Sequence, residues 1–331
     1  MNFTSMDYFV ALSEERSFTR AAERLSVTQQ TLSAHVANVE RELGVRLVNR
    51  RVPLTLTYAG EVFLGYARRL QSLERSMRQE FFDIAGDQQG LLGVGIASTR
   101  GHMLMPEAIS SFGATHPGVS VLLHEEENDR LLELLHAGKI DMAVATVDHS
   151  RADLVVRPLY REQVVLLASR ALIGRTLADD APAALARLER DGDLAPLADV
   201  PLMMLGERDE PGDLARRLLA RSGVEPRVAV HSKNSETLID LAARDVGACF
   251  VPFELATDAI ARHGEGCLLM AGLGADAYID IDVAWRASDH VWSVVTDFYD
   301  VLVELFAARP HAIADAGVAT GGADGGKGAR A

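Results

Sequence analysis

The sequence holds only two cysteines in 331 residues, Cys249 and Cys267. They lie too far apart for a CxxC pair and are too few for the disulfide framework that stabilises small secreted domains. We therefore expect two ordinary buried thiols in a reducing compartment. The chain also lacks any apolar run near the roughly 20 residues that cross a bilayer, and Asp7 interrupts the region where a secretion signal would be apolar. These absences predict a cytoplasmic protein without a membrane partner.

Motifs for catalysis, metals and dinucleotides are missing as well. The ten histidines are scattered, without an HExxH pair or a close set of cysteine and histidine. Gly93 and Gly95 follow the start of an apolar run, but Ser98 stands where a dinucleotide fingerprint has its third glycine. The three consecutive glutamates at 125–127 are more typical of a solvated turn than of a metal site. The sequence thus predicts no catalytic residues, no metal and no cofactor.

Lysine is absent from the first 87 residues, where 11 arginines balance 11 acidic residues. The formal net charge of −14 therefore arises in residues 88–331, which hold 22 basic and 36 acidic residues. Within the neutral part, residues 28–39 contain no acid, and residues 44–58 contain three arginines and no acid. A polar and basic face suited to nucleic acid is thus present although the whole chain is acidic.

Four helical patterns occupy the N-terminal part. Apolar residues recur at helical spacing over 6–12, 18–25, 29–43 and 58–85, and glycine at position 44 is placed to end the third helix. The stretch 45–56 is β-branched and contains proline, which predicts a short hairpin instead of a helix. The residues expected to cap the four helices are Thr4 or Ser5, Ser17, Thr28 and Thr57.

The second and third helices form a helix-turn-helix pattern in which Ala21 and Ala22 permit close crossing. Small polar side chains at the start of the third helix cannot drive folding, but they suit hydrogen bonds to base edges in a major groove. Arginines of the hairpin would reach phosphates. A three-helix packing module with a merely polar face is the alternative. The residues predicted to contact DNA are Thr28, Gln29, Gln30, Thr31, Ser33, Ala34, His35, Arg50, Arg51 and Thr57.

The fourth helix carries an apolar seam with alternating steps of three and four residues. A seam of this length on a solvent-facing helix predicts a coiled-coil contact with a second copy. A helix packed within a monomer would give the same pattern. The predicted dimer contacts are Phe63, Tyr66, Leu70, Leu73 and Met77.

From residue 91 onward, strand patterns alternate with helical ones, which predicts βαβ units and a parallel sheet. If the chain crosses twice between two α/β lobes, the lobes enclose a cleft. The Ala-rich segment 171–200 fits no pattern, and the Gly/Ala-rich tail 309–331 predicts disorder. Strands are expected at 91–98, 119–127, 140–147, 163–169, 201–205, 227–232, 248–252 and 278–286, and helices at 106–116, 129–137, 212–221, 235–244 and 291–306.

The motifs SFTRAAERL, LSAHV-NVERELG-RL and LT-AG resemble the winged helix-turn-helix of LysR-type transcriptional regulators. The sequence departs from that family at Gln30-Thr31, at Val48-Asn49 and over 171–200. The resemblance covers residues 1–306 and implies an α+β chain. Its parts would be a winged helix-turn-helix DNA-binding domain at 1–58, a linker dimerisation helix at 59–87, and a two-lobed α/β effector-binding domain of the periplasmic-binding-protein type at 91–306, with lobe 1 at about 91–161 and 268–306 and lobe 2 at about 162–267.

What the resemblance implies is a regulator whose promoter binding changes when a small molecule enters the cleft. Its partners would be double-stranded promoter DNA, itself as homodimer or homotetramer, the effector, and RNA polymerase. Arg100 and Arg208 near helix N-termini favour an anionic effector with a carboxylate, with solvated loop arginines as the alternative. The effector contacts implied by the family are Ser98, Thr99, Arg100, Asn128, Val144, Thr146, Gly206, Arg208, Ser232 and Asn234.

Three other functions compete with this interpretation. An enzyme on the two-lobed fold would need paired catalytic groups and would leave the first 87 residues unexplained. A solute-binding protein would need a secretion signal. A DNA-binding protein without a ligand stays open until ligand binding is measured.

Overall fold

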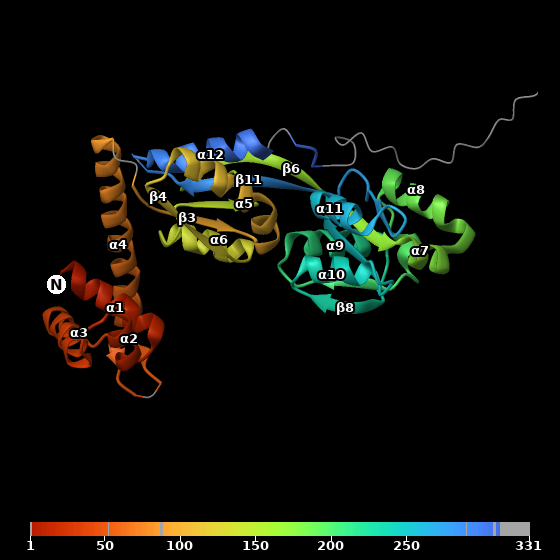
Figure 1. Ribbon diagram of the computed structural model, residues 1–331. Helices are drawn as coiled ribbons and strands as arrows, with labels where there is room; N and C mark the ends of the chain where they lie inside the picture. The colour runs from red at the N-terminus through yellow and green to blue at the C-terminus, as the bar shows by residue number, and fades with distance from the viewer. Residues whose placement is uncertain (1, 52, 87–88, 289, 307–308, 312–331) are drawn as a thin grey trace, which may run out of the picture.

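A computed structural model describes residues 2–51, 53–86, 89–288, 290–306 and 309–311. The chain forms a small N-terminal helical unit, one long helix, and two α/β lobes joined by shared strands (Figure 1). Among the described helices, none combines the length and apolarity needed to cross a membrane. The part of the predicted disordered tail from 312 onward lies outside the described residues.

The N-terminal unit contains three helices and a two-stranded antiparallel hairpin, the predicted wing. Its core buries Phe9, Leu12, Leu32 and Val36, and Ala21 and Ala22 are 0% and 3% exposed where the helices cross. The elements are α1 (Phe3–Glu15), α2 (Phe18–Arg24), α3 (Gln29–Leu43), β1 (Val48–Asn49) and β2 (Thr55–Leu56).

Three of the four predicted caps are confirmed. Ser17 accepts the backbone N–H of Arg20, Thr28 accepts that of Thr31, and Thr57 caps the fourth helix. The prediction for the first helix was wrong, because the cap is Asn2 and not Thr4 or Ser5. Asn2 has extended backbone angles that allow its Oδ1 to accept the N–H of Ser5 at 2.9 Å.

The long helix α4 (Tyr58–Ala85) has 28 residues, so at about 1.5 Å per residue it spans roughly 42 Å. Gly86, at φ 66°, ends it. The first half packs on the N-terminal unit, with Phe63 edge-to-face on Phe9 at 4.9 Å between ring centroids. The second half leaves Leu73, Met77, Phe81 and Ile84 exposed.

Lobe 1 follows α4 and is a sheet in the order β4-β3-β5-β11-β6. Helix α6 covers one face and α5 with α12 the other (Figure 1). The elements are β3 (Gly90–Ile96), α5 (Ser98–Thr115), β4 (Val119–Glu125), α6 (Asn128–His136), β5 (Met142–Ala145), β6 (Leu154–Ser169), β11 (Tyr278–Arg286) and α12 (Ser293–Phe306).

Lobe 2 continues the sheet from β6 in the order β9-β7-β8, with β10 also paired to β6. The unassigned segment 171–200 is helical and adds buried leucines to the core of this lobe. The elements are α7 (Arg170–Leu177), η1 (Ala178–Asp180), α8 (Ala181–Asp191), η2 (Ala195–Leu197), β7 (Leu202–Leu205), α9 (Glu210–Arg221), β8 (Val228–Ser232), α10 (Ser235–Ala242), β9 (Ala248–Pro252), α11 (Phe253–His263) and β10 (Leu268–Ala271).

The predicted parallel pairing of strands is confirmed within each lobe, but the sheet as a whole is mixed. β3 is parallel to β4 and β5, and β7 is parallel to β8 and β9, but β6 and β11 run antiparallel to their neighbours. β6 is 16 residues long and serves both lobes, whereas the sequence predicted it only from 163. Charged residues and Pro158 interrupt the apolar pattern of its first half. Pairing with β11 nevertheless keeps this half in a strand.

Two further boundaries were mispredicted. α5 begins at Ser98 and not at Pro106, so the proline lies inside the helix, where burial of Leu104 and Met105 offsets the backbone hydrogen bond that proline cannot donate. Residues 309–311 are ordered, contrary to the predicted tail. His311 is 3% exposed, its ring stacks on Tyr160 with centroids 3.9 Å apart, and its carbonyl accepts the N–H of Gln163 at 2.9 Å.

Candidate DNA-binding and effector sites

The start of α3 presents its polar side chains to solvent. Thr28, Gln29, Gln30, Thr31 and Ala34 are all exposed, whereas Leu32, Val36 and Val39 are buried on the opposite face of the helix. The hydroxyls of Thr28 and Thr31 lie 2.8 Å apart, and Thr28 also holds the N–H of Thr31 as the helix cap. Gln29 and Gln30 have the longest hydrogen-bonding side chains among these exposed residues.

Two residues of the predicted DNA surface are turned toward the protein. The Nδ1 atom of His35 lies 2.9 Å from the hydroxyl of Ser5, and its ring meets the ring of Tyr8 edge-on at 4.8 Å. His35 therefore fastens α3 to α1. Ser33 is also partly buried.

Arg50 and Arg51 follow β1 in the hairpin, and both are exposed. Arg50 lies 3.5 Å from the carboxylate of Glu40 and above the ring of Phe18. Glu40 also accepts the N–H of Leu47 at 2.8 Å, so it ties the hairpin to α3. Sequence reasoning missed this positioning residue, since its spacing alone resembles that of any solvated helix glutamate.

Thr57, which the sequence predicted to contact DNA, holds the hairpin and the start of α4 together. Its Oγ1 donates to the carbonyl of Arg46 at 2.6 Å and accepts the N–H of Gly60 at 3.0 Å. A side chain on Gly60 would collide with the carbonyl of Leu47, 2.0 Å from its Cβ position. These contacts fix the hairpin against the start of α4.

The predicted dimer contacts separate into two groups. Phe63 is 8% exposed and belongs to the core of its own chain, and Leu70 packs against that core. Tyr66, Leu73 and Met77 are 60%, 66% and 50% exposed. An open apolar groove of about 530 Å³ lies between the start of α4 and the segment 43–47. The exposed part of the seam therefore starts at Tyr66.

The cavity between the lobes measures about 200 Å³. Lobe 1 contributes residues 97–100 and 125–128, and lobe 2 contributes 206–211, Lys233 and Pro252. Of the predicted effector contacts, Ser98, Thr99, Arg100, Asn128, Gly206 and Arg208 line it.

The other four predicted contacts lie outside that lining. Val144 is fully buried in the sheet, and Thr146 exchanges two 2.9 Å backbone hydrogen bonds with the Asn128 side chain. Ser232 accepts the N–H of Asn234, which caps α10. Of these four residues, Thr146 acts on the cavity indirectly, because it orients the lining residue Asn128.

Polar contacts join the lobes across the cavity. Glu127 lies 3.4 Å from Arg208 and 3.2 Å from Lys233. The hydroxyls of Thr99 and Ser235 are 3.3 Å apart. The lobes therefore already touch at the cavity rim.

Arg100 is engaged inside the protein. It is 3% exposed, and its Nη2 lies 3.3 Å from Oε2 of Glu162, which is fully buried. Burial raises the pKa of Glu162, while the charge of Arg100 works in the opposite direction. Since Arg208 also has a carboxylate partner in Glu127, the two-arginine argument for an anionic effector loses its basis.

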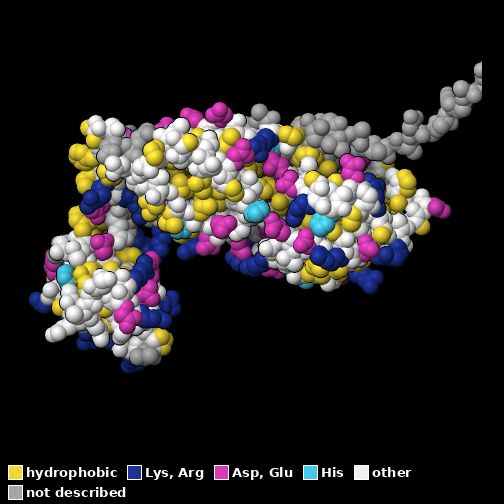
Figure 2. Space-filling view, in the orientation of Figure 1, with side chains coloured by type: hydrophobic (Ala, Val, Ile, Leu, Met, Phe, Trp, Pro, Cys, Tyr) yellow, Lys and Arg dark blue, Asp and Glu magenta, His cyan; other side chains and the backbone are white. Residues whose placement is uncertain are grey.

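Figure 2 shows acidic and basic side chains side by side at the junction between the lobes, and among the residues that line the cavity the acidic ones outnumber the basic ones. Six carboxylates and three basic side chains line it. Burial raises the pKa of Asp209 and of Glu210, against the opposing effect of nearby Arg100. The acids are Glu125, Glu126, Glu127, Glu207, Asp209 and Glu210.

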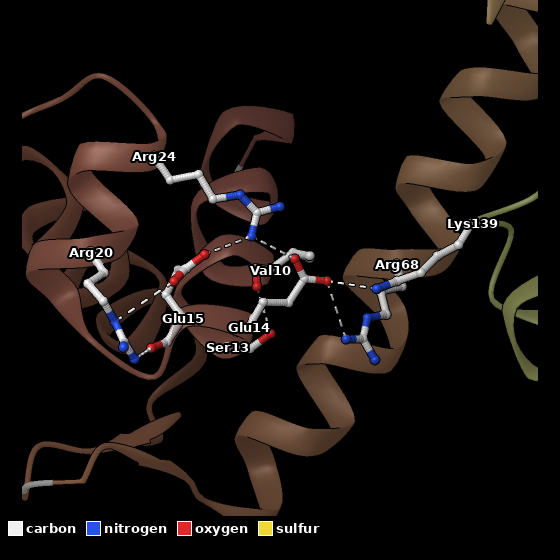
Figure 3. Close-up of polar contacts among 8 residues, drawn as sticks. All are labelled: Val10, Ser13, Glu14, Glu15, Arg20, Arg24, Arg68 and Lys139. Carbon is white, nitrogen blue, oxygen red and sulfur yellow. Dashed lines mark hydrogen bonds and ion pairs between the residues drawn. The ribbon is translucent and has the colours of Figure 1, made fainter. Parts of the chain in front are cut away.

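Glu14 of α1 joins the N-terminal unit to lobe 1, as Figure 3 shows. Its Oε1 lies 2.8 Å from Nζ of Lys139 and 3.8 Å from Arg68 on α4, and its Oε2 lies 3.0 Å from Arg24 on α2. Burial alone would raise the pKa of Glu14, but Lys139 and Arg24 bring it below its usual value. One carboxylate thus connects α1, α2, α4 and lobe 1.

Further contacts fasten α4 to lobe 1. Arg75 donates to the carbonyl of Gly138 at 2.9 Å, and Gln79 donates to Asp141 at 3.1 Å. Near the end of the helix, Asp83 accepts the N–H of Ser293 at 3.0 Å. The turn after α6 is therefore held both by α4 and by Glu14.

Two family models match the chain. Residues 3–61 match the model described as "Bacterial regulatory helix-turn-helix protein, lysR family", and residues 85–307 match "LysR substrate binding domain". The first spans the N-terminal unit and the start of α4. The second spans both lobes.

Curated relatives give a consistent result. The chain is 31% identical over 254 residues to a hydrogen peroxide-inducible genes activator of Pectobacterium carotovorum, covering 76% of this chain and 80% of the relative. The protein of the same description from Haemophilus influenzae is 33% identical over 171 residues, 51% of this chain and 56% of that relative. Full-length OxyR from Pseudomonas aeruginosa superposes with a TM-score of 0.65 at 25% identity, covering 92% and 94% of the two chains.

Proposed function

The chain belongs to the LysR family of bacterial transcriptional regulators, and from this premise we propose that α3 and the hairpin bind promoter DNA under the control of a small molecule in the interlobe cavity. Its family models and its relatives are DNA-binding regulators and not enzymes.

The observation that supports these DNA-binding residues is the exposed start of α3, which lies between α1 and the hairpin. Gln29 and Gln30 project from a helix that His35 and the core fix on α1, and Arg50 and Arg51 flank it on the hairpin. Glutamine pairs with adenine by two hydrogen bonds in the major groove, and arginine neutralises phosphates. His35 and Thr57 act as positioning residues in this arrangement.

A second copy of the chain would supply the second half-site of a promoter. We propose that Tyr66, Leu73 and Met77 of α4 form this contact, since they are the exposed members of the seam. Phe63 and Leu70 support the helix from the core of their own chain.

The effector signal would pass through α6. Glu127 precedes this helix at the cavity, held by Arg208 and Lys233 of lobe 2. Lys139 follows it and binds Glu14 of the N-terminal unit. A ligand that displaces the bridge at Glu127 would therefore act on a helix whose other end touches the DNA-binding unit.

Two relatives are described as hydrogen peroxide-inducible genes activators, but we do not propose a peroxide response for this chain. A thiol-based response needs an accessible thiolate. Cys249 is fully buried, and burial raises its pKa to about 12. Cys267 is partly buried, with its thiol 3.7 Å from the carbonyl of Ala243.

Fluorescence anisotropy of the full chain on the DNA upstream of its own gene, over a salt series with random DNA as competitor, tests the proposal. We expect at least a hundredfold preference for the specific fragment. Arg51→Ala should weaken binding to both DNAs and lower the salt slope by about one unit, as the loss of one phosphate contact does. Equal, weak binding to every genomic fragment would refute the proposed function.

A further inference from the structure

We propose that the effector is a small organic cation, bearing an ammonium or guanidinium group, that occupies the interlobe cavity. This inference rests on the proposed function, which supplies the site, and adds the chemistry of the ligand. It replaces the carboxylate effector that the sequence suggested.

The basic side chains at the cavity are already matched by acids. Nη2 of Arg100 faces the buried Glu162, and Arg208 and Lys233 share Glu127. Nε of Arg100 has no hydrogen-bond partner among the described residues, but it is buried and out of reach of a ligand in the cavity as it stands. An incoming anion would have to displace one of these partners. For Arg100 that displacement would leave a buried glutamate without its counter-charge, which is strongly unfavourable.

The acidic side chains are in the opposite situation. Five of the six lining carboxylates form no ion pair within the described residues. Asp209 accepts the N–H of Gly212 as the cap of α9, which leaves its second oxygen for another donor. Since these acids come from both lobes, a cation between them would hold the lobes together. The five are Glu125, Glu126, Glu207, Asp209 and Glu210.

The spread of these acids favours an organic cation over a metal ion. Metal sites need three or more ligands converging on one point, and the described residues contain no such group of His, Cys, Asp or Glu. An ammonium or guanidinium group has several donors that point in different directions and so suits carboxylates on separate walls. The volume of about 200 Å³ is below the roughly 300–1,000 Å³ of drug-sized ligand sites, which indicates a small metabolite.

The start of α5 sets a second requirement. Its first residue follows Ala97, and no side chain caps the helix there. The free N–H groups of the first turn lie in the cavity wall and suit an oxygen acceptor on the same ligand. The difference in affinity between L-arginine and agmatine, which lacks the carboxylate, will measure how much the ligand's carboxylate contributes to binding.

Isothermal titration of the full-length protein tests the charge of the ligand. The probes are L-arginine, agmatine and putrescine, each up to about 10 mM, with benzoate as the anionic probe. We expect at least one cation to bind with one-to-one stoichiometry, and benzoate not to bind. The double variant Glu125→Gln/Glu126→Gln should weaken that binding at least tenfold.

Asp258→Asn is the matched control, because Asp258 is an exposed acid of lobe 2 outside the cavity lining. It replaces one carboxylate by an amide, as each half of the double variant does, and should leave the affinity unchanged. Equal weakening by the control variant would mean that the cation binds through the general negative charge of the chain, and this would overturn the site.

Two results would overturn the inference while the proposed function stands. One is failure of all three cations to bind, and the other is saturable binding of benzoate that Arg208→Ala abolishes. Anisotropy measured on the same samples distinguishes failure of the proposed function from failure of the inferred ligand charge. Loss of specific DNA binding in the unmodified protein contradicts the proposed function, whereas specific DNA binding without cation binding contradicts only the charge of the ligand.

Discussion

Glu40 and Glu162 show how single carboxylates fix the two functional parts. Glu40 accepts the N–H of Leu47 and also lies near Arg50, so it fixes the position of the hairpin relative to α3. Glu162 neutralises Arg100 at the floor of the cavity. Both roles depend on partners that are distant in sequence, and a pattern of charges along the chain does not identify them.

Replacement of Gln29 by alanine should reduce the specificity of DNA binding. Loss of one bidentate contact to a base costs about 1–3 kcal/mol on the specific site and little on random DNA. Competition anisotropy at fixed salt measures the difference. The control is Arg51→Ala, which should weaken binding to both DNAs equally, and a Gln29→Ala variant that behaves in the same way would remove Gln29 from base recognition.

The variant Glu162→Gln should destabilise the effector lobes. It leaves Arg100 buried with a neutral partner, and breaking a buried ion pair costs about 3–5 kcal/mol. Urea unfolding of the full chain, followed by tryptophan fluorescence, measures the loss. Glu125→Gln, at an exposed position of the cavity rim, is the control. Equal midpoints for the two variants would contradict the structural role of the pair.

Among the elements, α4 combines two tasks along its length. Its first half completes the core of the N-terminal unit through Phe63, Leu64 and Ala67. Its second half contacts lobe 1 through Arg75 and Gln79 and leaves Leu73 and Met77 exposed. A continuous apolar pattern in the sequence therefore serves two different partners.

The variant Leu73→Asp should break the dimer without unfolding the chain. Leu73 is 66% exposed, so the charge is solvated in the monomer and is buried only in a dimer contact. Light scattering measures the mass, and circular dichroism confirms folding. Arg78→Asp, an exposed position outside the seam, should stay dimeric. A dimeric Leu73→Asp protein would refute the α4 contact.

At the scale of the whole molecule, two joints connect three bodies. β6 and β11 pass between the lobes, and Glu14 with Lys139 connects lobe 1 to the DNA-binding unit. Helix α6 begins after Glu127 at the interlobe cavity and ends shortly before Lys139 at the second joint. Because the apolar face of α6 is packed on the sheet, we expect the helix to move together with lobe 1.

Removal of the Lys139 charge should loosen the second joint. The pair with Glu14 is partly exposed, and such pairs contribute about 0.2–1 kcal/mol, so Lys139→Met should leave stability nearly unchanged. Energy transfer between dyes on α3 and lobe 2 should show a broader distance distribution. Arg130→Met removes a cation that pairs with Glu133 within α6 and is the control. Equal distributions in the two variants would exclude Lys139 from the joint.

The sequence by itself determined the elements whose causes are local. Caps, helical spacing and a β-branched hairpin lie within a few residues of each other, so α2, α3, α4 and the hairpin were predicted correctly, and the strand and helix alternation indicated α/β lobes. The polar start of α3 was also visible, because exposed residues at a helix start need no distant partner.

Tertiary structure decided what depends on distant partners. It turned β6 into a strand shared by two lobes, placed His35 on Ser5, Phe63 on Phe9 and His311 on Tyr160, and neutralised Arg100 with Glu162. The charge of the cavity was inaccessible to sequence reasoning for the same reason. A side chain's availability to a ligand depends on what the fold packs against it. Here Arg100 and Arg208 each have a carboxylate partner, and five of the six lining carboxylates form no ion pair within the described residues.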